Sequence, residues 1–439
     1  MLTGWRPQLS RRVSDRVRAA EADITETSHG IRSQLSYQWA ADSIMAQGES
    51  LSSSAIEGIY ASLAGMSMAR EGSDAASKAA LGNWEMSEQA LAMVEDDQLF
   101  TLDDLLELHS TLMSRTDKPH LAGQLRSGPV WIGAPAAAGL GPIGAQFVPP
   151  PPEAVEPLLE DLVDYINFSE HSPALRAAIA HAQFETIHPF LDGNGRTGRA
   201  LIQIALFRDE VEGALHLPVS RGLVANRSGY YDSLQRTRYE GPPYDEQRSR
   251  SLEPWIEMLS DSIQRATEQV RVAAQRTELL MKDWQERLGT LRSDSAVWKI
   301  SSRLAYQPVF TVESIKNSIA GETSLAAIRR GISRLKHAGI IEEFVTPRRT
   351  RLYRANEIIT LAEQVLGIQE ATSRSIGTRT EDWLPSEFIE GPSAGSGSEV
   401  PFSPIRQSTL QSAWLCSHEG KRSMKPCILR AGHSGQHRY

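Results

Sequence analysis

The stretch that decides the fold and chemistry of this chain is residues 188–199, with the sequence HPFLDGNGRTGR. It combines a histidine that can accept a proton, an aspartate that can bind Mg²⁺, and two arginines three positions apart. Gly193 and Gly195 allow successive backbone amides to turn toward one point and form an anion-binding nest. The N-terminus of a following helix would add its positive end to that nest. The stretch therefore predicts a polyphosphate site with a general base beside it.

Apolar periodicity places this stretch in a loop between two buried helices. Apolar residues share one helical face on each side of the loop: Leu175, Ala178, Ile179 and Ala182 before it, and Leu201, Ile202, Ala205 and Leu206 after it. His188 precedes a proline that stops the first helix, and Arg196–Arg199 open the second. Both arginines can then reach phosphate oxygens with paired donors.

Three other interpretations of the glycines are weaker. Residues 193–198 satisfy G-x-G-x-x-G, but the dinucleotide fingerprint needs a preceding strand and an acidic residue about 20 positions onward. Here an Ala-rich helical segment precedes the glycines, and Asp209 and Glu210 come too soon. A Walker A loop would end in Gly-Lys-Ser/Thr, which is absent. A helix–loop–helix turn with chance polar residues does not explain two glycines flanking Asn194 together with both arginines.

The stretch resembles the Fic family signature H-x-F-x-[DE]-G-N-G-R-x-x-R and matches it at every fixed position. The resemblance extends over about residues 35–265. It includes Gly123-Gln124-Leu125-Arg126, the run Phe147–Pro152, and Asn226-Arg227-Ser228-Gly229-Tyr230-Tyr231. Fic enzymes are mostly α-helical and typically transfer AMP from ATP to a hydroxyl group of a target protein.

The resemblance implies a role for each residue of the stretch. His188 would deprotonate the target hydroxyl, Asp192 would bind Mg²⁺, and Phe190 would pack into the core. The nucleotide would be held by the amides of Gly193–Gly195, by Asn194 and Gly198, by Arg196 at the β-phosphate, by Arg199 at the γ-phosphate, and by Tyr230 and Tyr231.

A second motif lies ahead of the predicted core. The run Ser53-Ser54-Ala55-Ile56-Glu57-Gly58 matches [ST]-x-x-x-E-[GN], which resembles the self-inhibition motif of the family. Taken alone, this run is more often a helix end with Gly58 as its C′ residue. Beside the complete signature it implies that Ser53, Glu57 and Gly58 are inhibitory, with Glu57 pairing with Arg199 so that ATP binds unproductively.

The fold class predicted is mostly α, with a Fic-type helical core, a β-hairpin flap and a C-terminal winged helix-turn-helix. Helical patterns occur near residues 35–48, 74–95 and 103–114 and continue after the hairpin to about residue 291. The hairpin is expected from the strand-like runs 130–132 and 146–148, which surround a Gly-, Ala- and Pro-rich tip. As a flap it would pair with the backbone of the target by strand addition.

Residues 294–356 have the pattern of a separate small domain. A helix over 312–319, a turn at 321–323, a helix from the N-cap Ser324 to His337, and strands 340–345 and 351–353 are expected. Their order resembles a winged helix-turn-helix. Residues 324–354 hold eight lysines and arginines but only two acidic residues, Glu342 and Glu343; the basic residues are Arg329, Arg330, Arg334, Lys336, Arg348, Arg349, Arg351 and Arg354. They would suit DNA phosphates, and the alternative is a dimerisation or target-docking module.

The C-terminal tail holds five soft ligands within 22 residues, which are enough for a Zn²⁺ site: Cys416, His418, Cys427, His433 and His437. Their spacing matches no standard zinc finger, so an unstructured tail or a Cys416–Cys427 disulfide stays open. The predicted domains are an N-terminal helical region with the inhibitory motif (1–110), a catalytic core (111–290), the winged helix-turn-helix (291–369), a flexible linker (370–413) and the Cys/His-rich tail (414–439).

Composition restricts the class of protein. A chain of 439 residues is long enough for two or three domains. The net charge of −8 gives no whole-protein footprint for nucleic acid. The first thirty residues lack an apolar signal core, and no run of about 18 apolar residues occurs. A reduced, cytoplasmic protein without a membrane partner is expected, because both cysteines lie in the tail.

The function predicted is an auto-inhibited protein adenylyltransferase that uses ATP and Mg²⁺. One alternative is removal of AMP from a modified target, with Glu57 orienting a water molecule. The other is a DNA-binding regulator whose Fic core is a sensor.

Overall fold

The structure is a computed structural model of the 439-residue chain. It describes residues 2, 4–34, 37–69, 74–95, 98–133, 142–209, 215–242, 246–292, 295–319, 323–345 and 349–367. The predicted linker and the Cys/His-rich tail, with Cys416, His418, Cys427, His433 and His437, lie outside the described residues. Of the helices that the structure describes, none is both long and apolar enough to cross a membrane.

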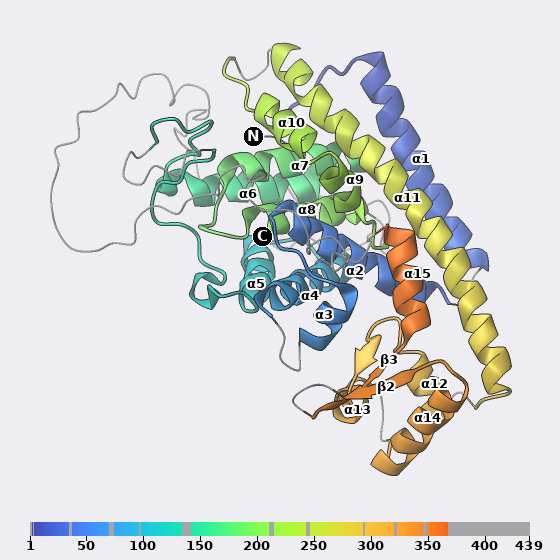
Figure 1. The fold of residues 1–439 in the computed structure, drawn as a ribbon. Helices are drawn as coiled ribbons and strands as arrows, with labels where there is room; N and C mark the ends of the chain where they lie inside the picture. The colour runs from blue at the N-terminus through green and yellow to red at the C-terminus, as the bar shows by residue number, and fades with distance from the viewer. Residues whose placement is uncertain are drawn as a thin grey trace, which may run out of the picture.

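The fold is mostly helical, as the sequence predicts (Figure 1). The helices of the first 290 residues are α1 (Arg11–Gln34), α2 (Gln38–Ile56), α3 (Leu63–Met68), α4 (Ala75–Glu95), α5 (Leu102–Met113), the 3₁₀ turn η2 (Pro119–Leu121), α6 (Pro152–Phe168), α7 (Pro173–Ile187), α8 (Asn194–Phe207), α9 (Val219–Ala225), α10 (Arg227–Thr237) and α11 (Glu246–Leu288). The C-terminal elements are α12 (Ala296–Ser301), β1 (Val309–Phe310), α13 (Val312–Ser318), α14 (Leu325–His337), β2 (Glu342–Val345), β3 (Arg351–Arg354) and α15 (Asn356–Leu366).

The central pair of helices is α7 and α8, which pack on each other along their length. Nearly every side chain of both helices is buried, because α6, α4, α2, α10 and α11 surround them. On the α11 side, the indole of Trp255 donates to the carbonyl of Ala178 over 2.8 Å. The loop between α7 and α8 is therefore held between two buried, closely packed helices.

The α2 helix runs without a break from the helical stretch expected near residues 35–48 to Ile56, so that the helix end expected at Gly58 belongs to the same helix. Serine favours helices weakly because its hydroxyl competes for backbone hydrogen bonds, and this run holds four serines between residues 50 and 54. Packing on α4 overrides that preference: Ser50 donates to the carbonyl of Ala80 over 2.6 Å, and Asn83 donates to Ser54 Oγ over 3.1 Å. As a result, the predicted inhibitory motif ends a buried helix.

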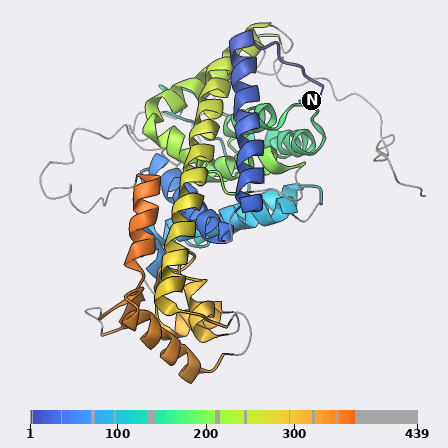
Figure 2. The same cartoon turned by 90° about the vertical axis from the view of Figure 1, so that its right-hand side faces the viewer.

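The long helix α11 connects the two ends of the molecule. It lies alongside α1 over much of its length (Figure 2). Ion pairs join the two helices, including Arg12 with Glu257 at 2.7 Å and Arg16 with Asp261. Its last turns reach the C-terminal elements, and α15 packs back against it (Figure 1).

The C-terminal elements contain a three-stranded antiparallel sheet in the order β1-β3-β2. The predicted helices and strands between residues 312 and 354 are all present. Ser324 caps α14 by accepting from the amide of Ala327, and Gly339 follows that helix with φ +71°. The sequence analysis missed α12, α15 and β1, the last because two residues are too few for a periodic pattern.

Two runs were predicted to form a hairpin. In the described part of the chain, these runs pair with each other at a single position. Ile132 and Phe147 form one antiparallel bridge, in which the Ile132 amide donates to the Phe147 carbonyl over 2.9 Å. The expected strands 130–132 and 146–148 are therefore one bridge instead of a regular ladder. The tip, residues 134–141, lies outside the described residues.

Candidate active site

The loop 188–193 joins α7 to α8 through two left-handed residues. His188 is the C-cap of α7 with φ 50° and ψ 63°, a conformation that L-residues other than glycine rarely adopt. Gly193 is the N-cap of α8 with φ 80°, where glycine carries no steric penalty. The prediction of a loop between two buried helices is confirmed, with the second helix beginning at Asn194.

Asn194 and Phe190 fix the shape of this loop. The Asn194 amide accepts from the Phe190 backbone N–H over 2.9 Å and donates to the Phe190 carbonyl over 2.8 Å. The Phe190 ring is fully buried and stacks on His109 with ring centroids 3.6 Å apart. The Asn194 side chain therefore holds the loop, a role that the sequence analysis did not give it.

We expect Asn194→Ala to lower the free energy of unfolding by about 2–4 kcal/mol, because two buried backbone groups of Phe190 lose their partners. Chemical denaturation of the full chain measures this change. The matched control is Asn317→Ala on the exposed side of α13, which should change stability by less than about 0.5 kcal/mol. Equal effects of the two substitutions would contradict the role of Asn194.

His188 is held at the mouth of the loop by Arg126. The guanidinium of Arg126 donates to the carbonyls of His188 at 2.8 Å and Ile187 at 3.2 Å, which lie at the end of α7. Burial, followed by the positive charges of Arg238 and Arg126, lowers the pKa of His188 to about 3. The imidazole is therefore neutral at physiological pH and able to accept a proton.

Asp192 lies beside the anion cradle with both carboxylate oxygens engaged. Oδ1 accepts from the Gly193 amide at 2.6 Å and from Arg196 at 3.3 Å, and Oδ2 accepts from Lys118 at 3.1 Å. Burial alone would raise its pKa, but Arg196 and Lys118 outweigh burial and hold the pKa of Asp192 below its ordinary value. Asp192 is thus an anionic, half-exposed oxygen ligand of the kind Mg²⁺ prefers.

The start of α8 has the geometry predicted for an anion cradle. Gly193 leaves no room for a Cβ, which would approach His109 and Met113 within 3.2 Å. Arg196 is almost fully buried, and no residue in the described ranges accepts a hydrogen bond from its Nε or Nη1. Two buried, unsatisfied cationic donors beside a helix N-terminus suit phosphate oxygens.

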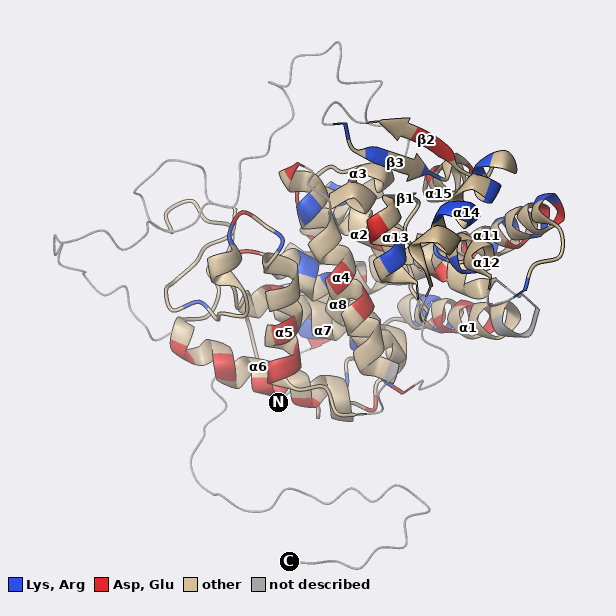
Figure 3. Ribbon diagram, turned by 90° about the horizontal axis from the view of Figure 1, so that it is seen from below, with Lys and Arg blue, Asp and Glu red and all other residues tan. Residues whose placement is uncertain are grey.

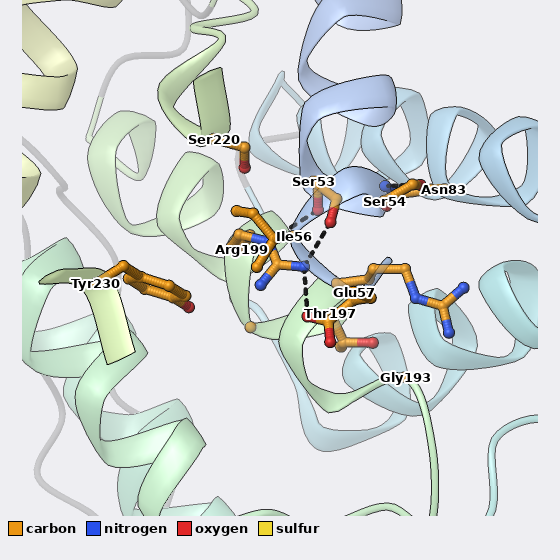
Figure 4. A network of polar contacts seen from close by, with 12 residues as sticks. Ser53, Ser54, Ile56, Glu57, Asn83, Gly193, Thr197, Arg199, Ser220 and Tyr230 are labelled. Carbon is orange, nitrogen blue, oxygen red and sulfur yellow. Dashed lines mark hydrogen bonds and ion pairs between the residues drawn. The ribbon is translucent and has the colours of Figure 1, made fainter. Parts of the chain in front are cut away.

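Arg199 is tied to the end of α2 (Figure 4). Its Nε donates to Ser53 Oγ over 2.9 Å, and its Nη2 donates to the Ser53 carbonyl and to Glu57 Oε1, each over 2.8 Å. Although burial opposes the charged form, Glu57 holds the pKa of Arg199 above its ordinary value. The predicted contact between the two motifs is therefore present, across 142 positions of sequence.

Glu57 also covers the cradle itself. A Cβ on Gly195 would overlap Glu57 Oε1, so the carboxylate lies directly against the backbone at the second residue of α8. Glu57 is the C-cap of α2, and Gly58 follows with φ +77°. Gly58 thus ends the helix as a C′ residue, and the same helix end carries the carboxylate into the anion site.

The Fic/DOC family model matches residues 99–206, which include the whole of this loop and the start of α8. The chain carries a Fic domain. The predicted inhibitory motif on α2 and the elements after residue 206 lie outside that match.

Curated relatives of the Fic domain are named protein adenylyltransferases. Protein adenylyltransferase fic-1 of Caenorhabditis elegans is 35% identical over 148 residues, which make up 33% of this chain and 25% of the relative. Protein adenylyltransferase Fic of Drosophila willistoni is 37% identical over 112 residues, 25% of this chain and 20% of the relative. The chain thus spans about a quarter of the length of these relatives. Among solved structures, a Fic family protein from Desulfovibrio desulfuricans G20 covers 80% of this chain and 98% of its own, at 20% identity and a TM-score of 0.46.

The two tyrosines predicted to bind nucleotide lie on α10, beyond the matched part of the Fic domain. Tyr230 is buried, and its hydroxyl lies 2.8 Å from Nε2 of His181. Tyr231 is half-buried and donates to the Ile56 carbonyl over 3.2 Å, one residue before Glu57. Gly198 faces into the core, where His181 Nδ1 lies 2.8 Å from its carbonyl.

Four further residues of the Fic domain site were missed by the sequence analysis: Lys118, His109, Arg126 and Glu185. Lys118 and His109 come from α5 and the segment after it, about 75–85 positions before their partner Asp192. Arg126 stood in a run that resembles the family, but nothing in that run indicated a contact with His188. Only Glu185 has a local sequence feature, because it lies three positions before His188 and thus on the same helical face.

Proposed function

We propose that the chain is an auto-inhibited protein adenylyltransferase, which transfers AMP from ATP to a hydroxyl side chain of a target protein. The observation that supports this most is the meeting of a neutral His188, an anion cradle with unsatisfied arginine donors, and Glu57 across that cradle. The relatives carry this activity in their names, and the matched part of the chain holds the loop.

In the proposed reaction His188 takes the proton of the target hydroxyl. The hydroxyl oxygen attacks the α-phosphorus of ATP, the bond to the β,γ-pyrophosphate breaks, and pyrophosphate leaves with the bonding electrons. Its negative charge would be held by Arg196, by Arg199 and by the amides at the start of α8. Tyr230 and Tyr231 are proposed to border the nucleotide.

Asp192 is the residue proposed to hold Mg²⁺ with the phosphates of ATP. Its lowered pKa and partly exposed carboxylate fit the ion, although Lys118 occupies Oδ2 and would have to give way. When bound, Mg²⁺ neutralises phosphate charge and orients the chain of phosphates. Arg196 then remains free to turn its unsatisfied donors toward the β-phosphate.

Inhibition is proposed to come from Glu57. Its carboxylate engages Arg199, the residue assigned to the γ-phosphate, and lies where an anion would enter above Gly195. Bound ATP would meet a negative charge at the far end of the cradle and take an unproductive pose. The signal that withdraws Glu57 must therefore act on the end of α2.

The same geometry supports one alternative, the removal of AMP from a modified target. Glu57 could orient a water molecule toward the phosphorus when no ATP is bound. Loss of label from a pre-modified protein separates this reaction from transfer, because it needs Glu57 intact, whereas transfer is restrained by it.

The other alternative is a DNA-binding regulator with the Fic domain as a sensor. Helix α14 presents basic residues outward (Figure 3), among them the exposed Arg329 and Arg330. Against this, Lys336 and Arg351 both pair with Glu343. We therefore propose the unit 291–369 as a winged helix-turn-helix that docks a target or a second copy, with residues 126–152 as the flap. A gel shift with the full chain tests DNA binding.

Zinc binding by the tail stays a prediction, because all five ligands lie outside the described residues. We expect about one Zn²⁺ per chain in purified protein and a loss of that metal in Cys427→Ser. Metal analysis of both proteins measures this. Substoichiometric zinc in both samples would contradict the prediction.

The experiment that tests the main proposal is mass spectrometry of target proteins after incubation of a lysate with ATP and the Glu57→Gly protein. We expect AMP on Ser, Thr or Tyr side chains, and little of it with the wild-type chain. Absence of AMP-modified residues from both reactions would contradict the proposal.

A further inference from the structure

A buried carboxylate lies beside the proposed catalytic base. Glu185 is on the last turn of α7, with 8% of its surface exposed, and its Oε2 lies 3.9 Å from Nδ1 of His188. Within the ranges that the structure describes, Glu185 Oε1 is buried and has no hydrogen-bond partner. Gly198 on α8 leaves the space for this carboxylate, since a Cβ there would come within 2.9 Å of Oε1. An unsatisfied buried carboxylate is costly for stability, and such groups often serve function.

The charged groups around His188 and Glu185 indicate a role for the Glu185 carboxylate. His188 faces the positive charges of Arg238 and Arg126 and the more distant Asp192, which together with burial depress its pKa to about 3. Glu185 is buried near Arg199 of α8, Glu57 of α2 and Arg238, and burial raises its pKa to about 7. An imidazole with so low a pKa is a weak base, so proton transfer needs a negative charge that stabilises the imidazolium.

We propose that Glu185 is a positioning residue for His188, whose carboxylate stabilises the imidazolium formed when the target hydroxyl gives up its proton. The inference rests on the proposed function. The hydroxyl proton passes to the ring of His188, Nδ1 keeps its hydrogen on the Glu185 side, and the new positive charge is offset by the carboxylate. The proton afterwards leaves to solvent and restores the neutral ring.

The backbone of Glu185 separates the role of its charge from that of its position. The backbone of Glu185 also acts on the His188 ring and favours its charged form, which raises the ring pKa. Glu185→Gln retains that backbone and the size of the side chain, and it removes only the negative charge. Glu185→Asp retains the charge at a greater distance from Nδ1.

The first arm of the test is the pH profile of kcat for AMP transfer, measured in the Glu57→Gly background. Because the pKa of Glu185 is about 7 and that of His188 about 3, Glu185 loses its negative charge first as the pH falls, and kcat should fall around neutral pH as Glu185 protonates. Glu185→Gln should remove this acid limb. It should also lower the plateau of kcat about 10- to 100-fold with KM for ATP unchanged, and Glu185→Asp should restore part of both.

The second arm is independent of activity. In an NMR titration of labelled histidine in the full chain, the ring signals of His188 should shift around neutral pH as Glu185 ionises. This step should be absent in Glu185→Gln and present in Glu156→Gln, which removes an exposed charge from α6. A step that persists in Glu185→Gln would overturn the inference, as would a loss of kcat in Glu185→Gln that leaves the acid limb in place. If the Glu57→Gly protein transfers no AMP, the proposed function fails, and the titration alone still decides whether Glu185 acts on His188.

Discussion

Replacement of His188 by alanine, in a Glu57→Gly background, is expected to lower the rate of AMP transfer by a factor of about 10²–10⁴. The imidazole is neutral and sits at the end of α7, where a target hydroxyl would meet the α-phosphorus. ATP binding should change little, because the phosphates are assigned to Arg196, Arg199 and the α8 amides. Rates of label incorporation and calorimetric titration with ATP measure the two quantities.

The left-handed backbone at His188 makes a control necessary. Alanine tolerates φ 50° less well than histidine does, so the loop of the variant could shift. His188→Asn removes the base with a residue that adopts this conformation more readily, and it should be as inactive as His188→Ala. Transfer within about threefold of the parent in either variant would exclude His188 as the base.

Replacement of Glu57 by glycine is expected to raise AMP transfer on the order of 10- to 150-fold. A charge-assisted hydrogen bond to a buried arginine is worth roughly 1.5–3 kcal/mol, and that energy now opposes productive binding of ATP. Adding Arg199→Ala should erase the gain, since the freed guanidinium is what holds the γ-phosphate. Initial rates of the single and double variants measure this.

Two further variants should activate AMP transfer to smaller extents than Glu57→Gly does. Glu57→Gln keeps the size of the side chain without its charge and should activate less than glycine does. Ser53→Ala keeps Glu57 and removes only the hydroxyl that accepts from Arg199 Nε, so it should activate least. An unchanged rate in Glu57→Gly against several targets would mean that Ser53–Gly58 is only a helix end.

The sequence predicted those parts of the site whose residues follow one another in the chain. The loop, the two buried helices beside it and the pairing of Glu57 with Arg199 all followed from two short motifs. The continuity of α2 from residue 48 to its end did not follow, because four serines favour a helix weakly and only packing on α4 reverses that preference. Lys118 and Arg126 were missed for a related reason, since a single basic residue in a loop carries no periodic pattern, and only the fold brings it to Asp192 or to the end of α7.

In the C-terminal elements too, local features were predicted and a feature that depends on distant contacts was missed. Ser324 and Gly339 mark the start and the end of α14 both in the sequence and in the structure. Helix caps can be predicted because they depend on residues next to each other in the chain. The strand β1 pairs with β3 at Val309–Arg354 and Phe310–Tyr353. It was missed because two residues are too few to show the alternating pattern that predicts a strand.

Transfer of AMP, as opposed to transfer of a phosphoryl group, is tested most directly by the position of the label in ATP. The Glu57→Gly protein is incubated with a lysate and with ATP labelled at either the α- or the γ-phosphorus. The arrangement of His188, Arg196 and Arg199 predicts that protein is labelled from α-labelled ATP and not from γ-labelled ATP, and that His188→Ala abolishes the label. Labelling from the γ-phosphorus, or labelling that persists in His188→Ala, would contradict the account.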